Sequence, residues 1–225
     1  MRNDHELPAG TLKARDVYRL MTSLVTPRPI AWVSTIDEEG RGNLAPFSYY
    51  QAVCSAPPTI VLSIGRRGDG SRKDTLANVL ATGELTINHV SHALAGPMNA
   101  SSVELPHAIS EWDTLEIARA PAKQVAPARV AEALAGLECR LTHAIPLGVG
   151  PSGPSSTLVI AEVVHFWARE GLIQRDERGH LRAIDPAALD AIGRLGGDGY
   201  ATTRERFDLA RPELPAGRPS DRGKS

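Results

Sequence analysis

Three stretches with the character of β-strands follow one another between residues 30 and 64, separated only by short turns. Residues 30–36 and 43–50 flank the turn-forming sequence 37–40, which predicts a hairpin. Residues 59–64 form a continuous apolar run, which predicts a strand that is buried on both faces. A parallel connection needs a crossover of about a dozen residues, usually a helix, and these turns are too short for one. The spacing therefore predicts antiparallel neighbours.

The other periodic segments add further strands and a few short helices. Strands are expected at 84–90, 138–145 and 157–167. Helices are expected from near Ala14, where Val17, Leu20, Met21 and Leu24 share one face, from Ser71–Thr75 to a stop at Gly83, and at 92–101, 129–137 and 186–195. Strands dominate, so the predicted fold class is mainly β, a single antiparallel barrel with a few short peripheral helices.

Charge and composition exclude several classes of protein. The 225 residues include 25 Lys and Arg against 26 Asp and Glu, a net charge of −1, so no overall positive field draws in nucleic acid or a membrane surface. No apolar run has the length of a membrane span. The two cysteines, Cys54 and Cys139, lack metal-ligand spacing, which indicates reduced thiols and a cytoplasmic protein. A bound anion would have to be held by a local site.

A glycine-rich loop at 65–70 is the best candidate for such a site. Four cations cluster in and beside it: Arg66, Arg67, Arg72 and Lys73. The loop lacks the lysine and hydroxyl residue of a nucleotide triphosphatase loop. It does lead into a helix whose first amides are unpaired, so a phosphate would fit there. The alternative is an ordinary helix start with solvated basic residues, and Asp74 is expected to cap that helix.

Other familiar patterns fail the test of context. The sequence from Gly148 to Gly153 reads GxGxxG, but prolines interrupt it and a strand follows, so it predicts a turn instead of a dinucleotide site. The seven histidines show no metal-ligand spacing, and no serine lies in a nucleophile motif. We therefore expect no metal site and no catalytic residue from the chain itself. A cofactor would have to supply the chemistry.

Several short motifs occur in a definite order along residues 14–212. They are Arg28-Pro-Ile-Ala-Trp-Val-Ser-Thr35, Gly40, Asn43-Leu-Ala-Pro-Phe-Ser-Tyr-Tyr50, Pro57-Pro58, Lys73-Asp-Thr75 with Asn78, Asn88, Gly193-Arg-Leu-Gly-Gly197, Tyr200 and Arg211-Pro212. This series closely resembles the flavin reductase-like family, FMN-binding split-barrel proteins that include flavoredoxins, ferric reductase-like proteins and the reductase components of two-component monooxygenases. The resemblance implies an antiparallel split barrel over 14–212, an N-terminal extension at 1–13, a disordered tail at 213–225, and a homodimer with FMN near the interface.

The resemblance also implies which residues bind the cofactor. Those facing the isoalloxazine and ribityl chain, largely through backbone groups at 43–48, would be Ser34, Thr35, Asn43, Leu44, Ala45, Pro46, Phe47, Ser48 and Ser63. Those taking the phosphate would be Ser71, Arg72, Lys73 and Thr75. Tyr200 would cover the flavin edge or reach it from the partner subunit, with His165 in the same neighbourhood, although both could be packing residues. The segments 65–70 and 102–132 match no motif and are expected to shape the substrate face.

For activity, the resemblance implies an NAD(P)H-dependent flavin reductase, in which NADH or NADPH passes hydride to flavin N5. The reduced flavin would pass electrons on, with a monooxygenase or a redox protein as partner. Two alternatives stay open: a flavoredoxin-type electron-transfer flavoprotein, including ferric reductase-like proteins, and a flavin-binding module without NAD(P)H turnover. No motif distinguishes NADH from NADPH, and no nucleic-acid or membrane partner is expected.

Overall fold

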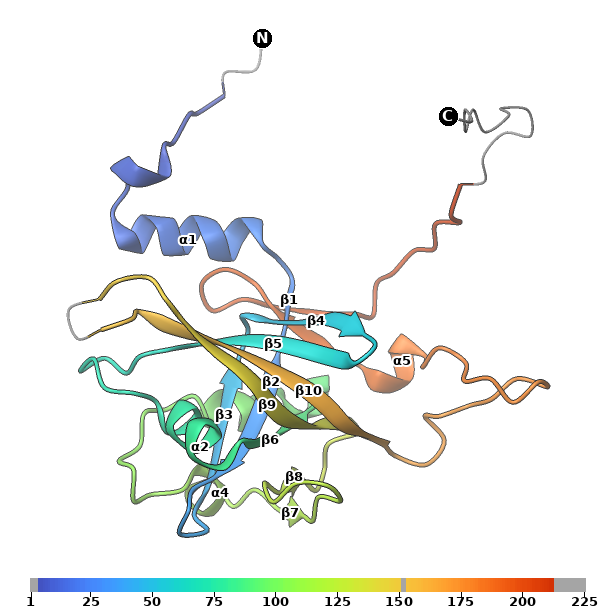
Figure 1. Cartoon of the computed structure of the whole chain (residues 1–225). Coiled ribbons are helices and arrows are strands. Elements are labelled where there is room, and N and C mark those ends of the chain that lie inside the picture. Colours follow the sequence, from blue (N-terminus) through green and yellow to red (C-terminus); the bar gives the residue numbers. More distant parts are fainter. Residues whose placement is uncertain (1–3, 151–152, 213–225) are drawn as a thin grey trace, which may run out of the picture.

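Seven antiparallel strands form the main sheet of the computed structural model, which describes residues 4–150 and 153–212 (Figure 1). In spatial order they are β3 (Gly42–Phe47), β2 (Ala31–Ile36), β6 (Glu84–Asn88), β9 (Ala135–Leu147), β10 (Ser156–Ala168), β5 (Pro58–Gly65) and β4 (Tyr50–Ser55). The two end strands, β3 and β4, are not paired with each other, so the sheet stays open. The predicted antiparallel fold is confirmed.

Two small sheets complete the strand arrangement. One consists of β1 (Arg28–Pro29), β11 (Ile192–Arg194) and β12 (Tyr200–Thr202), with β11 in the middle. The other pairs β7 (Arg119–Ala120) with β8 (Arg129–Val130). Because β1 leads directly into β2, the first of these sheets brings the C-terminal part of the described chain next to the start of the main sheet (Figure 1).

The helices are short and lie at the periphery of the sheet (Figure 1). They are η1 (Ala9–Thr11), α1 (Ala14–Leu24), α2 (Asp74–Thr82), η2 (His92–Leu94), α3 (Ala95–Ala100), α4 (Glu111–Thr114) and α5 (Pro186–Leu189). The predicted stop of α2 is confirmed, since Gly83 has a φ of 72° and its amide bonds to the Val79 carbonyl. None of the described helices has the length and apolar character of a membrane span.

Two predictions about the early strands are wrong. The stretch 43–50 is not one strand: β3 ends at Phe47 and β4 begins at Tyr50, and the two lie at opposite ends of the sheet. The chain therefore changes position within the sheet at 48–49, where the polar and aromatic sequence gives no turn signal. In β5, Ile60, Leu62 and Ile64 are buried but the alternate residues are only half-buried, because a single face of this strand packs on the core.

Two predicted helices also need correction. Residues 129–137 are not helical, because β8 occupies their start and β9 begins at Ala135, where it pairs with both β6 and β10. The predicted helix at 186–195 ends at Leu189, because Asp190 adopts a φ of 45° and the chain then enters β11. In both places, strand pairing overrides a local preference for helix. The predicted turn at 148–153 does join β9 to β10, with residues 151–152 outside the described part.

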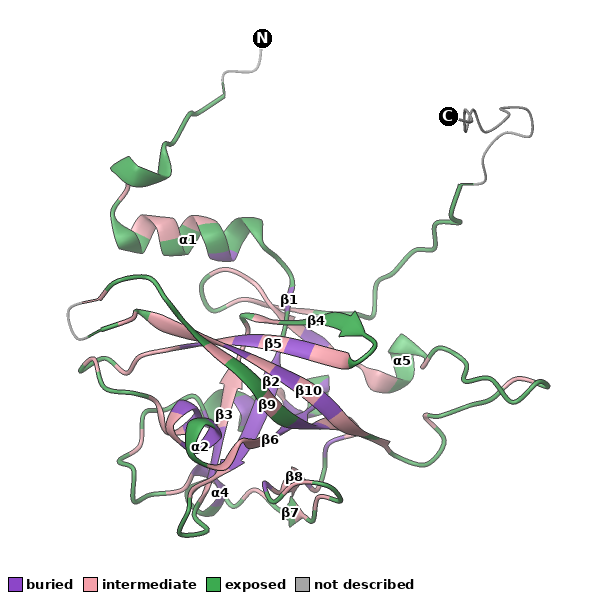
Figure 2. Cartoon of the chain, viewed as in Figure 1, coloured by how far each residue is buried: buried purple, intermediate pink, exposed green. Residues whose placement is uncertain are grey.

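Two apolar clusters fill the interior, one on each side of β2 (Figure 2). Ala31 and Val33 belong to the cluster that packs against α2, whereas Trp32 belongs to the cluster beneath α3 and α4. The Trp32 indole donates to the Ser101 hydroxyl at 2.9 Å. Both faces of β2 are therefore buried, which fixes the position of its neighbour β3.

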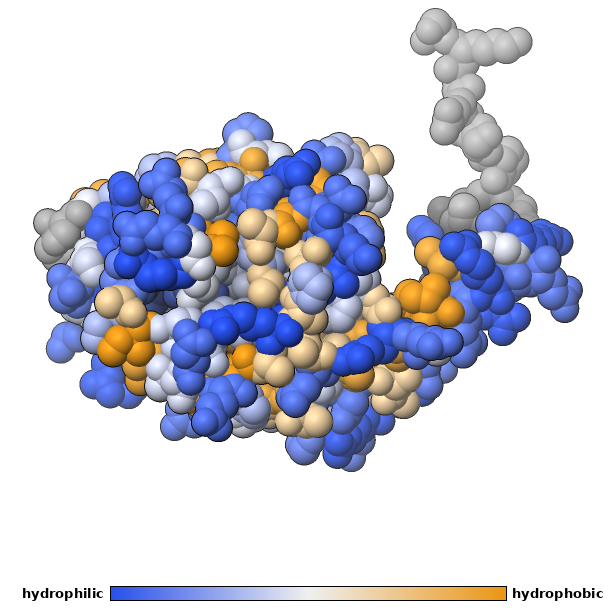
Figure 3. All heavy atoms as spheres, turned by 90° about the horizontal axis from the view of Figure 1, so that it is seen from below, coloured by the Kyte–Doolittle hydropathy of each residue, from blue (hydrophilic) through white to orange (hydrophobic). Residues whose placement is uncertain are grey.

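The surfaces outside these clusters differ in polarity. From below, the face near α4, β7 and β8 has a mainly hydrophilic rim, with hydrophobic residues in small, separate groups (Figure 3). At the opposite side, α1 stands apart from the sheet with Thr22 as its one buried residue (Figure 2). Residues 4–13, the predicted N-terminal extension, are almost all exposed. The predicted tail at 213–225 lies outside the described residues.

Candidate functional site

A groove runs between edge strand β3, the start of α2 and the segment 101–105. It consists of two cavities of about 160 and 140 Å³ that share Pro46, Phe47 and Ser102 in their walls. Other residues of the two walls include Ile30, Asn43, Ala45, Ser48, Gly65, Arg67, Lys73, Asp74, Thr75, Met98, Asn99, Ser101, Glu104, Glu111, Arg194 and Tyr200. One end is charged and the other carries an aromatic ring.

A buried polar network positions α2 against the sheet beside this groove. The Asn43 amide donates to Thr75 Oγ1 at 2.9 Å and to Thr35 Oγ1 at 3.3 Å, and the Asn78 amide donates to Thr35 Oγ1 at 3.1 Å. All four side chains are buried. Since a buried amide or hydroxyl without a partner is costly, the network fixes the helix start relative to β2 and β3.

Two cations stand at the charged end of the groove, and each has an acidic partner. The Lys73 ammonium lies 3.0 Å from a Glu104 carboxylate oxygen. The Arg67 guanidinium pairs with Asp74 and also donates to the Leu105 carbonyl. Asp74 was expected to cap α2, but it is the first residue inside the helix and its carboxylate is bound by Arg67 and by His107, at 2.8 Å.

The outer edge of β3 offers fewer free amides than the sequence predicts. The Leu44 amide donates to the Glu111 carboxylate at 3.0 Å. The next backbone nitrogen on this edge, which points away from β2, belongs to Pro46 and carries no hydrogen. Burial raises the pKa of Glu111, and the hydrogen bond from Leu44 opposes that rise. Glu111 therefore anchors the edge strand from α4 and leaves side chains as the main donors toward the groove.

Tyr200 forms the wall at the other end of the groove. Its hydroxyl donates to the Asn99 side chain at 3.0 Å, and the Arg194 guanidinium lies 4.5 Å from the centre of its ring. Nearby, Arg28 is buried and binds Ser48 as well as the Thr22 and Leu195 carbonyls. These contacts hold the 193–200 loop, the end of α1 and the end of β3 together.

The structure brings eight of the predicted cofactor residues to this groove. They are Asn43, Ala45, Pro46, Phe47, Ser48, Lys73, Thr75 and Tyr200. These residues come from three separate parts of the chain, at 43–48, 73–75 and 200, which the fold brings together.

The other predicted residues lie elsewhere. Leu44 faces the core, and Ser34 and Thr35 line a separate cavity of about 480 Å³ whose wall also includes Gly42 and Trp112. The buried Ser34 hydroxyl has no partner among the described residues. Arg72 lies in a further cavity beside Leu76, and Ser71 is exposed at the loop. Neither Ser63 on β5 nor His165 on β10 is among the described residues that line the groove.

Several residues of the groove were not assigned from the sequence. Ser101, Ser102 and Glu104 come from a stretch without a motif, and Glu111 follows it. Arg67 was recognised only as one of four loop cations, of which it and Lys73 reach the groove. The sequence signal available was the concentration of charge at 65–75, which does not reveal which side chains point inward.

A family profile described as flavin reductase like domain matches residues 21–185. The chain belongs to the flavin reductase-like family. A crystal structure of nitrilotriacetate monooxygenase component B from Bacillus cereus is 32% identical, with a TM-score of 0.84 over 93% of this chain and 100% of that one. A Shewanella frigidimarina protein described as a flavin reductase with a split barrel domain is 23% identical, with a TM-score of 0.73 over 91% of this chain and 95% of that one.

Among sequences, an uncharacterised protein of Deinococcus radiodurans is 39% identical over 199 residues, which cover 86% of this chain and 84% of that protein. The fold of the flavin reductase-like chain is accordingly a split barrel, in agreement with the open sheet described above. The chain is a flavin-related oxidoreductase of this family.

The groove fits the chemical demands of a flavin nucleotide. A flavin mononucleotide needs cationic or amide donors for its phosphate, polar groups along its ribityl chain and a flat surface for its ring system. The groove contains side chains of each kind: Lys73 and Arg67 for the first, Thr75 and Ser102 for the second, and Pro46, Phe47 and Tyr200 for the third, and these are the residues that would hold the cofactor.

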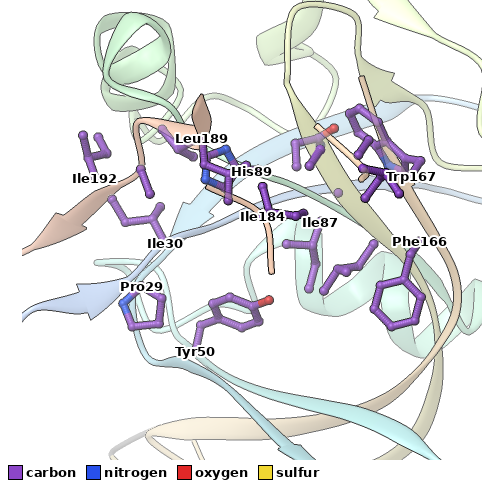
Figure 4. Close-up of a pocket in the computed structure, with 18 of the residues that line it drawn as sticks. Pro29, Ile30, Tyr50, Ile87, His89, Phe166, Trp167, Ile184, Leu189 and Ile192 are labelled. Atoms are coloured by element: carbon purple, nitrogen blue, oxygen red, sulfur yellow. The ribbon is translucent and has the colours of Figure 1, made fainter. Parts of the chain in front are cut away.

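A larger cavity of about 490 Å³ lies elsewhere, and its walls contain none of the predicted cofactor residues (Figure 4). Its described wall is mostly apolar and includes Ile87, Phe166 and Ile184. His89 also lines it, and burial lowers the pKa of this imidazole, both of whose nitrogens lack a partner. An apolar hollow of this kind is typical of a surface that another molecule covers, and it offers few polar groups that could orient a charged cofactor.

Proposed function

We propose that the chain is an FMN-binding, NAD(P)H-dependent flavin reductase. The observation that supports this most is the groove at the start of α2, in which Lys73 and Arg67 stand at one end and Tyr200 at the other. Its length and polarity suit FMN, and the family membership makes flavin chemistry the expected use of the site. FMN, when bound, would supply the hydride-accepting and electron-donating chemistry.

The chain's own part in this function is binding and orientation. Lys73 and Arg67 would hold the phosphate by charge-assisted hydrogen bonds, and Thr75 would add a hydroxyl. Pro46 and Phe47 would support one side of the ring system, and Tyr200 would stand at its edge. The buried Asn43–Thr75 contact keeps these two groups of residues in register, so cofactor orientation depends on the network beneath the groove.

The proposal extends to partners. A neighbour with 32% identity is a component of nitrilotriacetate monooxygenase, which supports a monooxygenase or another redox protein as the recipient of reduced flavin. A homodimer is part of the proposal because the isolated chain exposes apolar side chains on α1 and around the 490 Å³ cavity. Burial of such surfaces drives association.

The decisive experiment is anaerobic spectroscopy of the purified protein reconstituted with FMN. Addition of NADH or NADPH should bleach the absorbance of the oxidised flavin at a rate fast enough to support catalytic turnover. The nucleotide that reduces the flavin faster is the preferred donor. Free FMN with each nucleotide and no protein is the control. Bound FMN that keeps its oxidised spectrum with both nucleotides would overturn the reductase proposal and leave a flavin-binding protein.

The phosphate assignment has its own test in Lys73→Ala. Loss of a charge-assisted contact should weaken FMN binding by about 1.5 to 3 kcal/mol, or roughly tenfold or more, in a fluorescence titration. Lys123→Ala is a matched control, because Lys123 is exposed and lies outside the groove. Equal FMN dissociation constants for the two variants would contradict a phosphate contact at Lys73.

A further inference from the structure

A carboxylate of this chain occupies the cationic end of the groove. Glu104 Oε1 lies 3.0 Å from the Lys73 ammonium, and Glu104 Oε2 accepts the Gly68 amide at 3.4 Å. An ammonium and a backbone amide that converge on two anionic oxygens are the donors that a phosphate would use. Among the described residues, Glu104 is the one acidic partner of Lys73.

The two acidic residues at this end differ in how firmly they are held. Asp74 belongs to α2, its side chain is 18% exposed, and it is bound by both Arg67 and His107. Glu104 sits on an irregular segment and its side chain is 46% exposed. The Lys73 ammonium, followed by the Gly68 amide, holds the pKa of Glu104 below its usual range, so the carboxylate is ionised at neutral pH. Glu104 is therefore an anion that can move away.

A phosphate and Glu104 compete for these donors. The ammonium has three hydrogens to donate, but a carboxylate that stays at Lys73 and the Gly68 amide repels an incoming phosphate, so phosphate binding favours the arrangement in which Glu104 has moved away. The displacement is feasible because a solvent-exposed ion pair contributes little stability, and a dianionic phosphate interacts with the same cation more strongly than a carboxylate does.

We propose that Glu104 is an internal competitor for the phosphate subsite, so that FMN binds by displacing it from Lys73. This inference rests on the proposed function. Its consequence is that part of the phosphate's binding energy is used to release Glu104, which weakens FMN binding and speeds its release. The chain would thus handle FMN as an exchangeable substrate, and Glu104 would set how far FMN is preferred over riboflavin, which has no phosphate.

The competing interpretation is that the Lys73–Glu104 pair only fixes the segment 102–105 against the loop at 65–70. The two interpretations differ in sign. Removal of a competitor tightens FMN binding, whereas removal of a structural contact loosens the groove and weakens the binding of both flavins.

The test compares Glu104→Gln with Glu170→Gln in the full chain. Glutamine keeps the shape of the side chain and removes its charge, so both variants change the net charge equally. Glu170 is the control because it is exposed and has no ion pair in the described part of the chain. Fluorescence titrations with FMN and with riboflavin would be read together with the FMN release rate. Glu104→Gln should lower the FMN dissociation constant roughly three- to tenfold and slow FMN release, with riboflavin affinity unchanged.

A double-mutant cycle with Lys73→Ala adds a second arm. Without the ammonium Glu104 loses the main donor for which it competes with the phosphate and keeps only the long contact to the Gly68 amide, so Glu104→Gln should then change FMN binding by less than about twofold. An unchanged ratio of FMN to riboflavin affinity in Glu104→Gln, or weaker binding of both flavins, would overturn the competitor role while leaving the proposed function in place. Failure of the wild-type chain to bind either flavin would instead overturn the proposed function, and the competitor role with it.

Discussion

Burial keeps two titratable side chains of the main sheet, Tyr50 and Cys139, in their neutral forms. Tyr50, at the start of β4, packs against the apolar cluster that contains Cys139. Burial raises the pKa of the Tyr50 hydroxyl to about 12, and it raises that of the Cys139 thiol to about 12 as well. Both groups are therefore neutral at physiological pH, and Cys139 is inert there, whereas the unpaired Cys54 is exposed.

The raised pKa of Tyr50 predicts a loss of stability in alkali. Its pKa in the folded chain is above the unfolded value of about 10, so its contribution is fully present below pH 10 and is lost as the pH rises toward 12. Urea unfolding at pH 9 and pH 11 should show a decline that is smaller in Tyr50→Phe by about 1 kcal/mol, from the 1.36 kcal/mol per unit relation. Equal declines in the two proteins would contradict a raised pKa at the partly buried Tyr50.

For individual residues, the sequence predicted the chemical character of the site better than the position of each side chain in it. The concentration of cations at 65–75 predicted an anion site there, but nothing local showed that Lys73 and Arg67 line the groove whereas Arg72 lines a separate cavity. Thr35 was expected at the cofactor, whereas its hydroxyl oxygen accepts the Asn43 and Asn78 amides and its side chain lines the neighbouring cavity. Such partners come from distant segments and leave no local pattern.

The long hairpin of β9 and β10 depends on one close approach between elements. Gly136 on β9 lies beneath the Trp167 indole of β10, and a Cβ at this position would stand 2.4 Å from the Ile87 carbonyl oxygen and 2.7 Å from Trp167 Nε1. The Arg129 guanidinium lies 4.9 Å from the centre of the Trp167 ring. Only glycine allows the strand and the indole to pack this closely.

Gly136→Ala should therefore destabilise the sheet. The methyl group meets a backbone oxygen that cannot move without breaking the β6–β9 pairing, so we expect a loss of about 2 to 3 kcal/mol in the free energy of unfolding, at the upper end for overpacking. Urea denaturation provides the measurement. Gly96→Ala in α3, where a Cβ meets no atom within 4 Å, is the matched control and should leave stability unchanged or raise it by up to ~1 kcal/mol. Similar midpoints for both variants would contradict the packing argument.

Elements with strong local signals were predicted well, and those defined by pairing were not. Proline and glycine punctuation located α1 and the end of α2 at the correct residues. The start of β9 was missed because Ala-rich sequence at 129–137 favours helix, and only its pairing with Asn88 and Trp167 makes it a strand. The separation of β3 from β4 was missed because both read as one extended run.

The whole molecule carries apolar surfaces that a single chain does not cover. The apolar face predicted for α1 is only partly covered, with Val17 and Leu20 half-buried but Met21 at 50% and Leu24 at 79% exposure. The wall of the 490 Å³ cavity includes Phe166, which is 63% exposed (Figure 4). An amphipathic helix without a partner on its apolar face is stable only when another surface covers that face. The sequence predicted the amphipathic pattern, but a pattern does not say whether its partner lies in the same chain.

If a second copy covers α1, then Leu24→Asp should separate the dimer. Each leucine that loses burial removes about 1.5 to 3 kcal/mol, and a two-fold dimer contains the site twice, so the dimer dissociation constant should rise at least tenfold in sedimentation velocity. Arg15→Asp is the control, because Arg15 is exposed and lies nine positions away, on the opposite side of the helix. A wild-type chain that is monomeric at micromolar concentration would exclude the dimer. A Leu24→Asp variant that dimerises as tightly as Arg15→Asp would instead place the interface away from α1, with the cavity around Phe166 as the remaining apolar surface to test.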